Sequence, residues 1–212
     1  MVWLCNPNNP DGRVVEKTFL ETLLKNNPNC TFVVDEAYID FTDAISSAID
    51  LLDNCPNLIL VKSLTKNFSI PGLRLGYLIA NKAMVQNIQF FKPPWTVNSI
   101  AIEAGKYILQ RKHQFLPPVK QYKSDQKEFA EKLARIPGLE IWPSETSYFL
   151  IELEKSTSLE LKNYLISNFG LLIRDASNFR GLSEKFIRVA TLSKEKNQLL
   201  IDALTQWSKL NS

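Results

Sequence analysis

The chain has 212 residues, of which 45% are hydrophobic and 22% charged, as in an ordinary soluble globular protein. Its net charge of +3 is small and its lysines are scattered, which gives no case for nucleic-acid binding, and its single histidine excludes a Ser-His-Asp triad and a histidine-rich metal site. No apolar stretch is long enough to span a bilayer, and three cysteines without metal-type spacing predict reduced thiols in a cytoplasmic protein.

The first predicted element is a buried strand over residues 1–5, which leads directly into a polar loop, Asn6 to Gly12, that is dense in turn-forming residues. A helix over residues 14–25 follows, with its leucines and a phenylalanine on one face. Because domains rarely open on an unprotected core strand, we expect that sequence upstream of the first strand is missing.

Two further predicted strands each end at polar side chains. Residues 31–34 precede Asp35 and Tyr38, and residues 58–61 end just before the polar stretch from Ser63 to Lys66. The chain between them is long enough for a helical crossover, so the two strands can be parallel neighbours. Taken alone, the acid could be only a helix cap, and the lysine only a solvated side chain in a turn.

Parallel strands end on the same edge of a sheet, which is where open α/β sheets bind their ligands. We therefore expect Asn9, Asp35 and Lys66 to meet at one edge, with Arg74 following a Pro-Gly break. Arginine together with serine and threonine hydroxyls suits a phosphate, and a lysine in a partly desolvated pocket is a candidate Schiff-base nucleophile. The acid-rich turn also resembles a metal site, but no histidine accompanies it, so no metal is predicted.

The middle of the chain reads as one further strand and three helices, at residues 75–80, 82–91, 100–110 and 118–135. The sequence thus predicts an α/β fold, with part of a mostly parallel α/β sheet domain and a small α+β C-terminal domain. The expected bounds are residues 1–95 for the sheet domain, 96–125 for connecting helices and 126–212 for the small domain.

The small domain is predicted to contain strands at residues 139–142, 147–152 and 186–190 and helices at residues 159–168 and 194–210. The apolar run 171–173 leads into Arg174, and Arg188 lies in the apolar middle of the last strand. An arginine on the solvated face of a strand is ordinary. Two arginines here could instead form an anion clamp.

Read together, the motifs NPNNPDG, DEAY, SLTK with Arg74 downstream, and FIRVA resemble the pyridoxal-phosphate enzymes of the aspartate aminotransferase fold (fold type I), from Asn6 to the C-terminus. Within that fold the chain resembles the histidinol-phosphate aminotransferase branch. More narrowly, it is similar to the threonine-phosphate decarboxylases of cobalamin biosynthesis. The stretches SLTKNFSIPGLRLGY, PPWTVNSIAIEAG and LLIRDASNFRGL carry this narrower similarity.

The resemblance implies a role for each residue that the motifs single out. Lys66 would bond to pyridoxal 5′-phosphate and later move protons, and Asp35 would keep the pyridine nitrogen protonated so that the ring accepts electrons. Tyr38 and Asn9 would hydrogen-bond the ring oxygen. The cofactor phosphate would be held by Ser63, Thr65 and Arg74. On the substrate side, Arg188 would bind the carboxylate and Arg174 would help to bind the substrate's own phosphate, with Asn9 as a further substrate-binding residue.

The implied reaction is decarboxylation of L-threonine O-3-phosphate to (R)-1-aminopropan-2-yl phosphate by a homodimer. Two alternatives stay open: an aminotransferase such as histidinol-phosphate aminotransferase, and a catalytically silent binding or regulatory module with the same fold. The resemblance implies a further segment upstream of the first strand, which completes the phosphate-binding cup in the family, and we expect this segment to be missing. We therefore expect a C-terminal fragment that binds the cofactor weakly and turns over little by itself.

Overall fold

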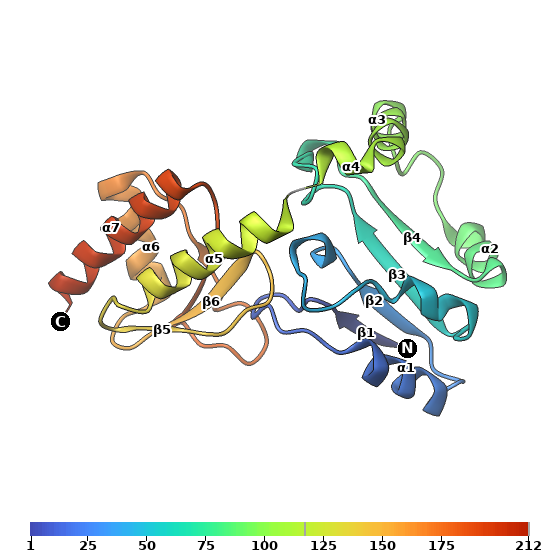
Figure 1. Ribbon diagram of the computed structural model, residues 1–212, viewed down its shortest axis with the longest axis horizontal. Helices are drawn as coiled ribbons and strands as arrows, with labels where there is room; N and C mark the ends of the chain where they lie inside the picture. The colour runs from blue at the N-terminus through green and yellow to red at the C-terminus, as the bar shows by residue number, and fades with distance from the viewer. Residues whose placement is uncertain (117, 212) are drawn as a thin grey trace. The chain divides into compact units, whose positions relative to one another are not determined.

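The protein is described by a computed structural model that covers residues 1–116 and 118–211 (Figure 1). Its contacts divide the chain into two compact units. Unit 1 comprises Met1–Asn8 and Val14–Val119, and unit 2 comprises Asn9–Arg13 and Lys120–Ser212. The division falls after Val119, and the expected connecting range was 96–125. The five loop residues Asn9–Arg13, expected in the sheet domain, belong by their contacts to unit 2.

Unit 1 is built on a mostly parallel sheet, as predicted. Its strands are β1 (Val2–Cys5), β2 (Phe32–Asp35), β3 (Leu58–Ser63) and β4 (Gly76–Ala80), which lie in that order in the sheet (Figure 1). The first three are parallel, and β4 pairs with β3 in the antiparallel direction. The carboxyl ends of β1, β2 and β3 therefore share one edge of the sheet, because parallel strands run in the same direction.

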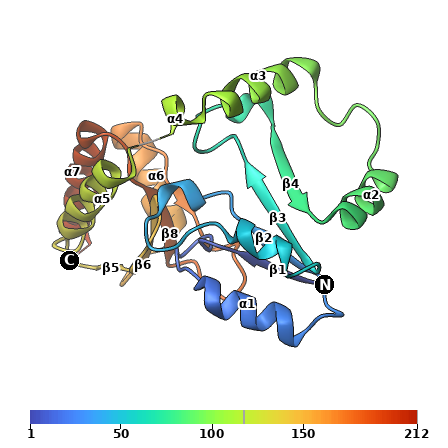
Figure 2. The same ribbon diagram turned by 45° about the vertical axis from the view of Figure 1, so that its right-hand side comes forward.

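One face of this sheet is covered by α1 (Lys17–Asn26), which lies along the strands in both views (Figure 1, Figure 2), and by a 3₁₀ segment, Ala48–Asp53. The core between them is mostly aliphatic and includes Leu20, Leu24, Val34, Leu58 and Leu60. The crossover from β2 to β3 contains 3₁₀ turns, at Ile39–Phe41 and Ala48–Asp53, where the sequence suggested a helical connection.

The helix α1 begins at Lys17, three residues later than the predicted start at residue 14. The side chain of Asn6 explains the difference, because it binds the main chain of Val15 in both directions. Asn6 Oδ1 accepts from the Val15 N–H at 2.9 Å, and Asn6 Nδ2 donates to the Val15 carbonyl at 2.9 Å. Such pairing mimics a strand partner and keeps this segment out of the helix.

The rest of unit 1 is helical, with α2 (Lys82–Phe91), α3 (Ser99–Gln110) and α4 (Lys112–Phe115). The side chains of Asn81 and Asn98 cap α2 and α3 by accepting the N–H groups of Met84 and Ala101. Within the described residues, no helix combines the length and the apolar character needed to cross a membrane.

Unit 2 contains a second sheet, in which β5 (Leu139–Ile141), β6 (Tyr148–Leu153), β8 (Phe186–Ala190) and β7 (Arg174–Asp175) are antiparallel neighbours in that order. Three helices, α5 (Val119–Leu133), α6 (Ser158–Phe169) and α7 (Lys194–Leu210), pack on one face. The shared core includes Leu133, Phe149, Ile151, Leu161, Ile187, Val189 and Leu204. The apolar run 171–173 lies outside any strand, and β7 begins only at Arg174.

Tyr122 of α5 gives unit 2 a predicted sensitivity to alkaline pH. Its hydroxyl lies 2.9 Å from the carbonyl oxygen of Thr191, and burial raises the pKa of Tyr122 to about 12. An unfolded tyrosine ionises near pH 10, so the resulting stabilisation is complete below about pH 10 and is lost as the pH rises toward 12. We expect the free energy of unfolding of unit 2 to fall by on the order of 2 kcal/mol across this window.

Denaturant titrations followed by fluorescence at about pH 9 and about pH 11.5 measure this loss. In Tyr122→Phe the loss across the window should shrink, although the variant starts from a lower stability because one hydrogen-bond donor is gone. An equal pH dependence in both proteins would show that another group is responsible.

Candidate functional site

Asp35 occupies the carboxyl end of β2, where it lies opposite Cys5 of β1 and Val61 of β3. The residue is half-buried, and its Oδ1 accepts a hydrogen bond from the Ala37 N–H at 2.9 Å. It forms no ion pair with any residue in the described part of the chain. The main chain thus holds this carboxylate in place at the sheet edge, and Oδ2 stays available to a cationic ligand atom. Tyr38 is the residue just before the 3₁₀ turn Ile39–Phe41, and it is also half-buried.

Two hydroxyls meet where β3 leaves the sheet. Ser63 Oγ lies 2.8 Å from Thr65 Oγ1 and also accepts the Thr65 N–H at 3.2 Å. The Leu64 N–H donates to the carbonyl of Leu75 at 3.1 Å, which closes the turn between β3 and β4. Because Arg74 immediately precedes Leu75, the hydroxyls stand at the start of this turn and the guanidinium-bearing residue at its end.

Lys66 and Arg74 are the cations of this turn, and both are exposed. Arg74 adopts a left-handed conformation with φ of 52°, and its Nη1 donates to the Pro71 carbonyl at 3.0 Å. A left-handed non-glycine residue costs about 1 kcal/mol, and such strain is found most often at ligand sites. Across the residues that the structure covers, neither cation is paired with a carboxylate. Two unneutralised cations beside two hydroxyls suit a phosphate.

A buried ion pair supports the same sheet edge, and the sequence reasoning missed it. Glu36, which is 2% exposed, pairs with Lys62 of β3. Its carboxylate also accepts from Ser47 Oγ at 2.6 Å and from the Ala48 N–H at 2.8 Å, and Lys62 Nζ donates to Ser47 Oγ at 3.0 Å. One signal was visible in the sequence, because Glu36 comes directly after an apolar strand and Lys62 interrupts another.

Asn67 is a second residue that sequence reasoning missed. It follows Lys66, is 9% exposed, and donates from Nδ2 to Asp40 Oδ2 at 2.5 Å. Asp40 also lies 3.6 Å from Lys112 Nζ, so the turn that carries Lys66 is tied to α4 through this carboxylate. Among described residues, the buried Asn67 Oδ1 has no hydrogen-bond donor.

The two arginines of unit 2 stand on neighbouring strands. Arg174 of β7 lies directly opposite Arg188 of β8, so both side chains leave the same face of the sheet. Arg174 donates to Asn178 Oδ1 at 3.0 Å, and the Arg188 guanidinium lies 5.0 Å from the ring centre of Tyr148. No carboxylate in the described ranges neutralises either one. Like charges placed opposite each other are unfavourable, so this face is suited to an anion that relieves the repulsion.

Asn9 belongs by its contacts to unit 2, and its expected place beside Asp35 stays a prediction. Arg188 Nη1 donates to Asn9 Oδ1, and the Gly12 carbonyl accepts the Glu145 N–H at 3.0 Å. These long-range contacts, which local sequence patterns do not reveal, place the loop tip with the arginine pair.

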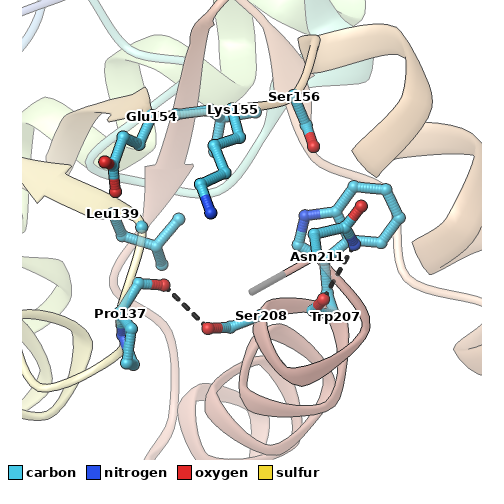
Figure 3. Close-up of a pocket in the computed structure, with 10 residues that line it drawn as sticks. Pro137, Leu139, Glu154, Lys155, Ser156, Trp207, Ser208 and Asn211 are labelled. Atoms are coloured by element: carbon cyan, nitrogen blue, oxygen red, sulfur yellow. Dashed lines mark hydrogen bonds between the residues drawn. The ribbon is translucent and has the colours of Figure 1, made fainter.

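A separate hollow of about 200 Å³ lies beside α7 in unit 2 (Figure 3). Lys155 extends into it, while Ser208 Oγ donates to the Pro137 carbonyl at 2.7 Å and Asn211 Nδ2 donates to the Trp207 carbonyl at 2.9 Å. None of the predicted site residues lines this hollow. Within the described parts of the chain, no group of three or more His, Cys, Asp or Glu side chains is placed to hold a metal ion.

Comparison with known proteins identifies the family. Residues 1–204 match the family of aminotransferases of class I and II. The chain is 31% identical over 209 residues to the histidinol-phosphate aminotransferase of Thermoanaerobacter sp., covering 97% of this chain and 56% of the relative. It therefore spans little more than half the length of this curated relative.

Two solved structures show the same fold. The L-threonine-O-3-phosphate decarboxylase of Porphyromonas gingivalis superposes with a TM-score of 0.93 at 42% identity, over 98% of this chain and 64% of that one. The histidinol-phosphate aminotransferase of Sinorhizobium meliloti, solved in complex with pyridoxal-5'-phosphate, superposes with a TM-score of 0.86 at 22% identity, over 100% of this chain and 58% of that one. Enzymes of this family depend on pyridoxal 5′-phosphate. By its match over residues 1–204, the chain belongs to the aminotransferase class I and II family.

Proposed function

We propose that the chain is part of a pyridoxal-phosphate carboxy-lyase that converts L-threonine O-3-phosphate to (R)-1-aminopropan-2-yl phosphate and carbon dioxide. The observation that carries this proposal is the unneutralised pair of Arg174 and Arg188 on one sheet face. A substrate with both a carboxylate and a phosphate offers two anionic groups to two cations. The 42% identity to the Porphyromonas gingivalis decarboxylase supports the same choice.

The residues at the edge of the first sheet fit the cofactor's chemistry. Asp35 has a carboxylate without a cationic partner among the described residues, which suits a pyridinium nitrogen. The hydroxyls of Ser63 and Thr65, with the guanidinium of Arg74, supply the donors that a phosphate requires. Lys66 would attach the cofactor through Nζ, and Tyr38 and Asn9 would hydrogen-bond the ring oxygen. When bound, pyridoxal 5′-phosphate supplies an electron sink for the electron pair left at the substrate's α-carbon.

The chain's own residues would then determine which bond at the substrate's α-carbon breaks, and they would move the proton that replaces the lost group. Arg188 would orient the substrate carboxylate, with Asn9 holding the guanidinium, and Arg174 would bind the substrate phosphate. Lys66 Nζ would return a proton to the α-carbon after carbon dioxide has left. Positioning dominates here, because a misplacement of about 1 Å can cost a factor of 10² in rate.

An aminotransferase is the second candidate, supported by the 31% identity to the Thermoanaerobacter histidinol-phosphate aminotransferase. Glutamate, its amino donor, carries two carboxylates that the same arginine pair could bind. L-Histidinol phosphate has a phosphate and no carboxylate, so it would use only one arginine as a charge partner. The third candidate, a catalytically silent module with this fold, has less support because the cationic and acidic groups of the site are all present.

Product analysis separates the three candidates. The full chain is incubated with pyridoxal 5′-phosphate, 2-oxoglutarate and either O-phospho-L-threonine or L-histidinol phosphate, and carbon dioxide, the amine, glutamate and the keto product are quantified in single-turnover amounts. The decarboxylase proposal expects equal amounts of carbon dioxide and the amine. Formation of a keto product together with glutamate from 2-oxoglutarate would favour the aminotransferase. Cofactor binding without any product would favour the silent module.

A homodimer and a cytoplasmic location stay predictions, and sedimentation equilibrium tests the first of them.

Arg188→Gln is expected to weaken binding of O-phospho-L-threonine by about 10- to 100-fold, because a hydrogen-bonded contact to a charged group contributes about 1.5–3 kcal/mol. Isothermal titration with the cofactor-loaded chain measures the dissociation constant. Arg180→Gln is the matched control, because Arg180 is exposed and its position lies off both strands of the arginine pair. Equal losses in the two variants would exclude a specific role for Arg188.

A further inference from the structure

The loop between β1 and α1 is fixed at its base by Asn6, as described above, and its tip, residues 9–13, belongs to unit 2. The tip packs on the segment from Trp142 to Thr146, here named the loop seat. The Glu145 N–H donates to the Gly12 carbonyl at 3.0 Å, and the Arg13 guanidinium lies 5.6 Å from the ring centre of Trp142. The tip therefore has a defined receptor within unit 2.

Gly12 makes the closest approach in this contact. It is buried and adopts a left-handed conformation with φ of +72°. A Cβ atom added at this position would lie 1.9 Å from Ser144 Oγ and 2.8 Å from Ser144 Cβ. It would also lie 3.1 Å from Thr146 Cγ2. Position 12 thus requires glycine for two separate reasons: its backbone conformation and the space taken by Ser144.

The loop seat is itself held by hydrogen bonds and an ion pair, so its position does not depend on the tip alone. Ser144 Oγ accepts the Thr146 N–H at 3.2 Å, and Gln126 of α5 donates to the Thr146 carbonyl. Gln126 is 2% exposed and Thr146 is fully buried. Lys123, also on α5, pairs with Glu145 at 3.1 Å. A seat anchored to a helix in this way can position what packs on it.

The placement of Gly12 also affects Asn9, which lies three residues earlier in the same loop tip. Asn9 accepts a hydrogen bond from Arg188. We propose that Ser144 is a positioning residue: its fit against Gly12 sets the loop tip so that Asn9 orients the Arg188 guanidinium toward the substrate carboxylate. Arginine presents its donors in a rigid fork, so turning one nitrogen turns all of them. This inference rests on the proposed function of Arg188, because the carboxylate is that of the proposed substrate.

The test is a double-mutant cycle between positions 12 and 144. Gly12→Ala is expected to weaken binding of O-phospho-L-threonine to the cofactor-loaded chain by about tenfold, as the tip moves away from its seat. Ser144→Gly alone should weaken the affinity by about two- to fivefold, because the tip loses the side chain against which it is set. In the double variant, the Ser144 atoms that clash with the new methyl group are gone, so the affinity should return to the level of Ser144→Gly alone.

Gly138→Ala is the matched control. Gly138 has a similar conformation, with φ of +79°, but a Cβ atom there would meet nothing within 4 Å. The Gly138→Ala variant therefore has the backbone strain of an alanine in the left-handed region without any steric conflict. Should Gly12→Ala fail to fold, Ser144→Val crowds the same contact from the opposite side and takes its place.

Hydrogen exchange of the Glu145 amide provides a readout that does not depend on any ligand. Exchange should become faster in Gly12→Ala and return toward the wild-type rate in the double variant, because this amide donates to Gly12. If wild-type protein does not bind O-phospho-L-threonine, the proposed substrate is wrong, while this exchange pattern still decides whether Ser144 seats the loop. The inference is overturned if Gly12→Ala behaves like Gly138→Ala, or if Ser144→Gly restores neither exchange nor affinity.

Discussion

Lys66→Ala is expected to lower the rate of substrate turnover by about 10²- to 10⁴-fold, which is the contribution of a positioned proton-transfer group. The same variant should lose covalent labelling when the chain is treated with pyridoxal 5′-phosphate and then with borohydride. Lys66 is the lysine expected to react because it is exposed beside the hydroxyls and guanidinium that would hold the cofactor phosphate. Peptide mapping by mass spectrometry locates the label.

Lys82→Ala serves as the control for this prediction. Lys82 is exposed at the first position of α2 and lies in the same unit, so it reports non-specific modification of surface lysines. Lys62 provides an internal check, because its amine is engaged by Glu36 and Ser47. A label that persists in Lys66→Ala, or that maps to Lys62, would contradict the assigned role.

Glu36→Ala is expected to destabilise unit 1 by about 3 kcal/mol, because it leaves the Lys62 ammonium, whose side chain is only 13% exposed, without its carboxylate partner. The substitution also removes the acceptor for Ser47 Oγ and for the Ala48 N–H. Hydrogen exchange of the β2 and β3 amides measures the loss within unit 1 and does not require the two units to unfold together.

Two comparisons make this second prediction specific. Glu36→Gln combined with Lys62→Met removes both charges while keeping an acceptor for the neighbouring donors, so it should be more stable than Glu36→Ala. Glu103→Ala breaks an exposed pair with Lys106 on α3, at 2.7 Å, and should change exchange little. If Glu36→Ala were no worse than Glu103→Ala, the buried pair would have no structural role.

Local patterns in the sequence were sufficient where an element is defined by its own residues. The last strand and the last helix were predicted at residues 186–190 and 194–210, and β8 and α7 have these bounds. Ser193 caps α7 by accepting the Lys196 N–H, a local interaction that a serine before an amphipathic run already indicates. The length of chain between β2 and β3 allowed them to be parallel neighbours, as they are, and the combined motifs identified the family.

Hydrophobic period, caps and motif spacing are local properties, so the residues alone indicated most of the elements and the fold class, while the roles of the groups at the sheet edge stay predictions. Three contacts became visible only in the folded chain: Arg174 lies opposite Arg188, Asn9 lies with Arg188 in unit 2, and Glu36 is buried against Lys62. Each of these contacts depends on strand register or on segments far apart in the chain. Such pairings are set by how the whole core packs, which no short stretch of sequence encodes.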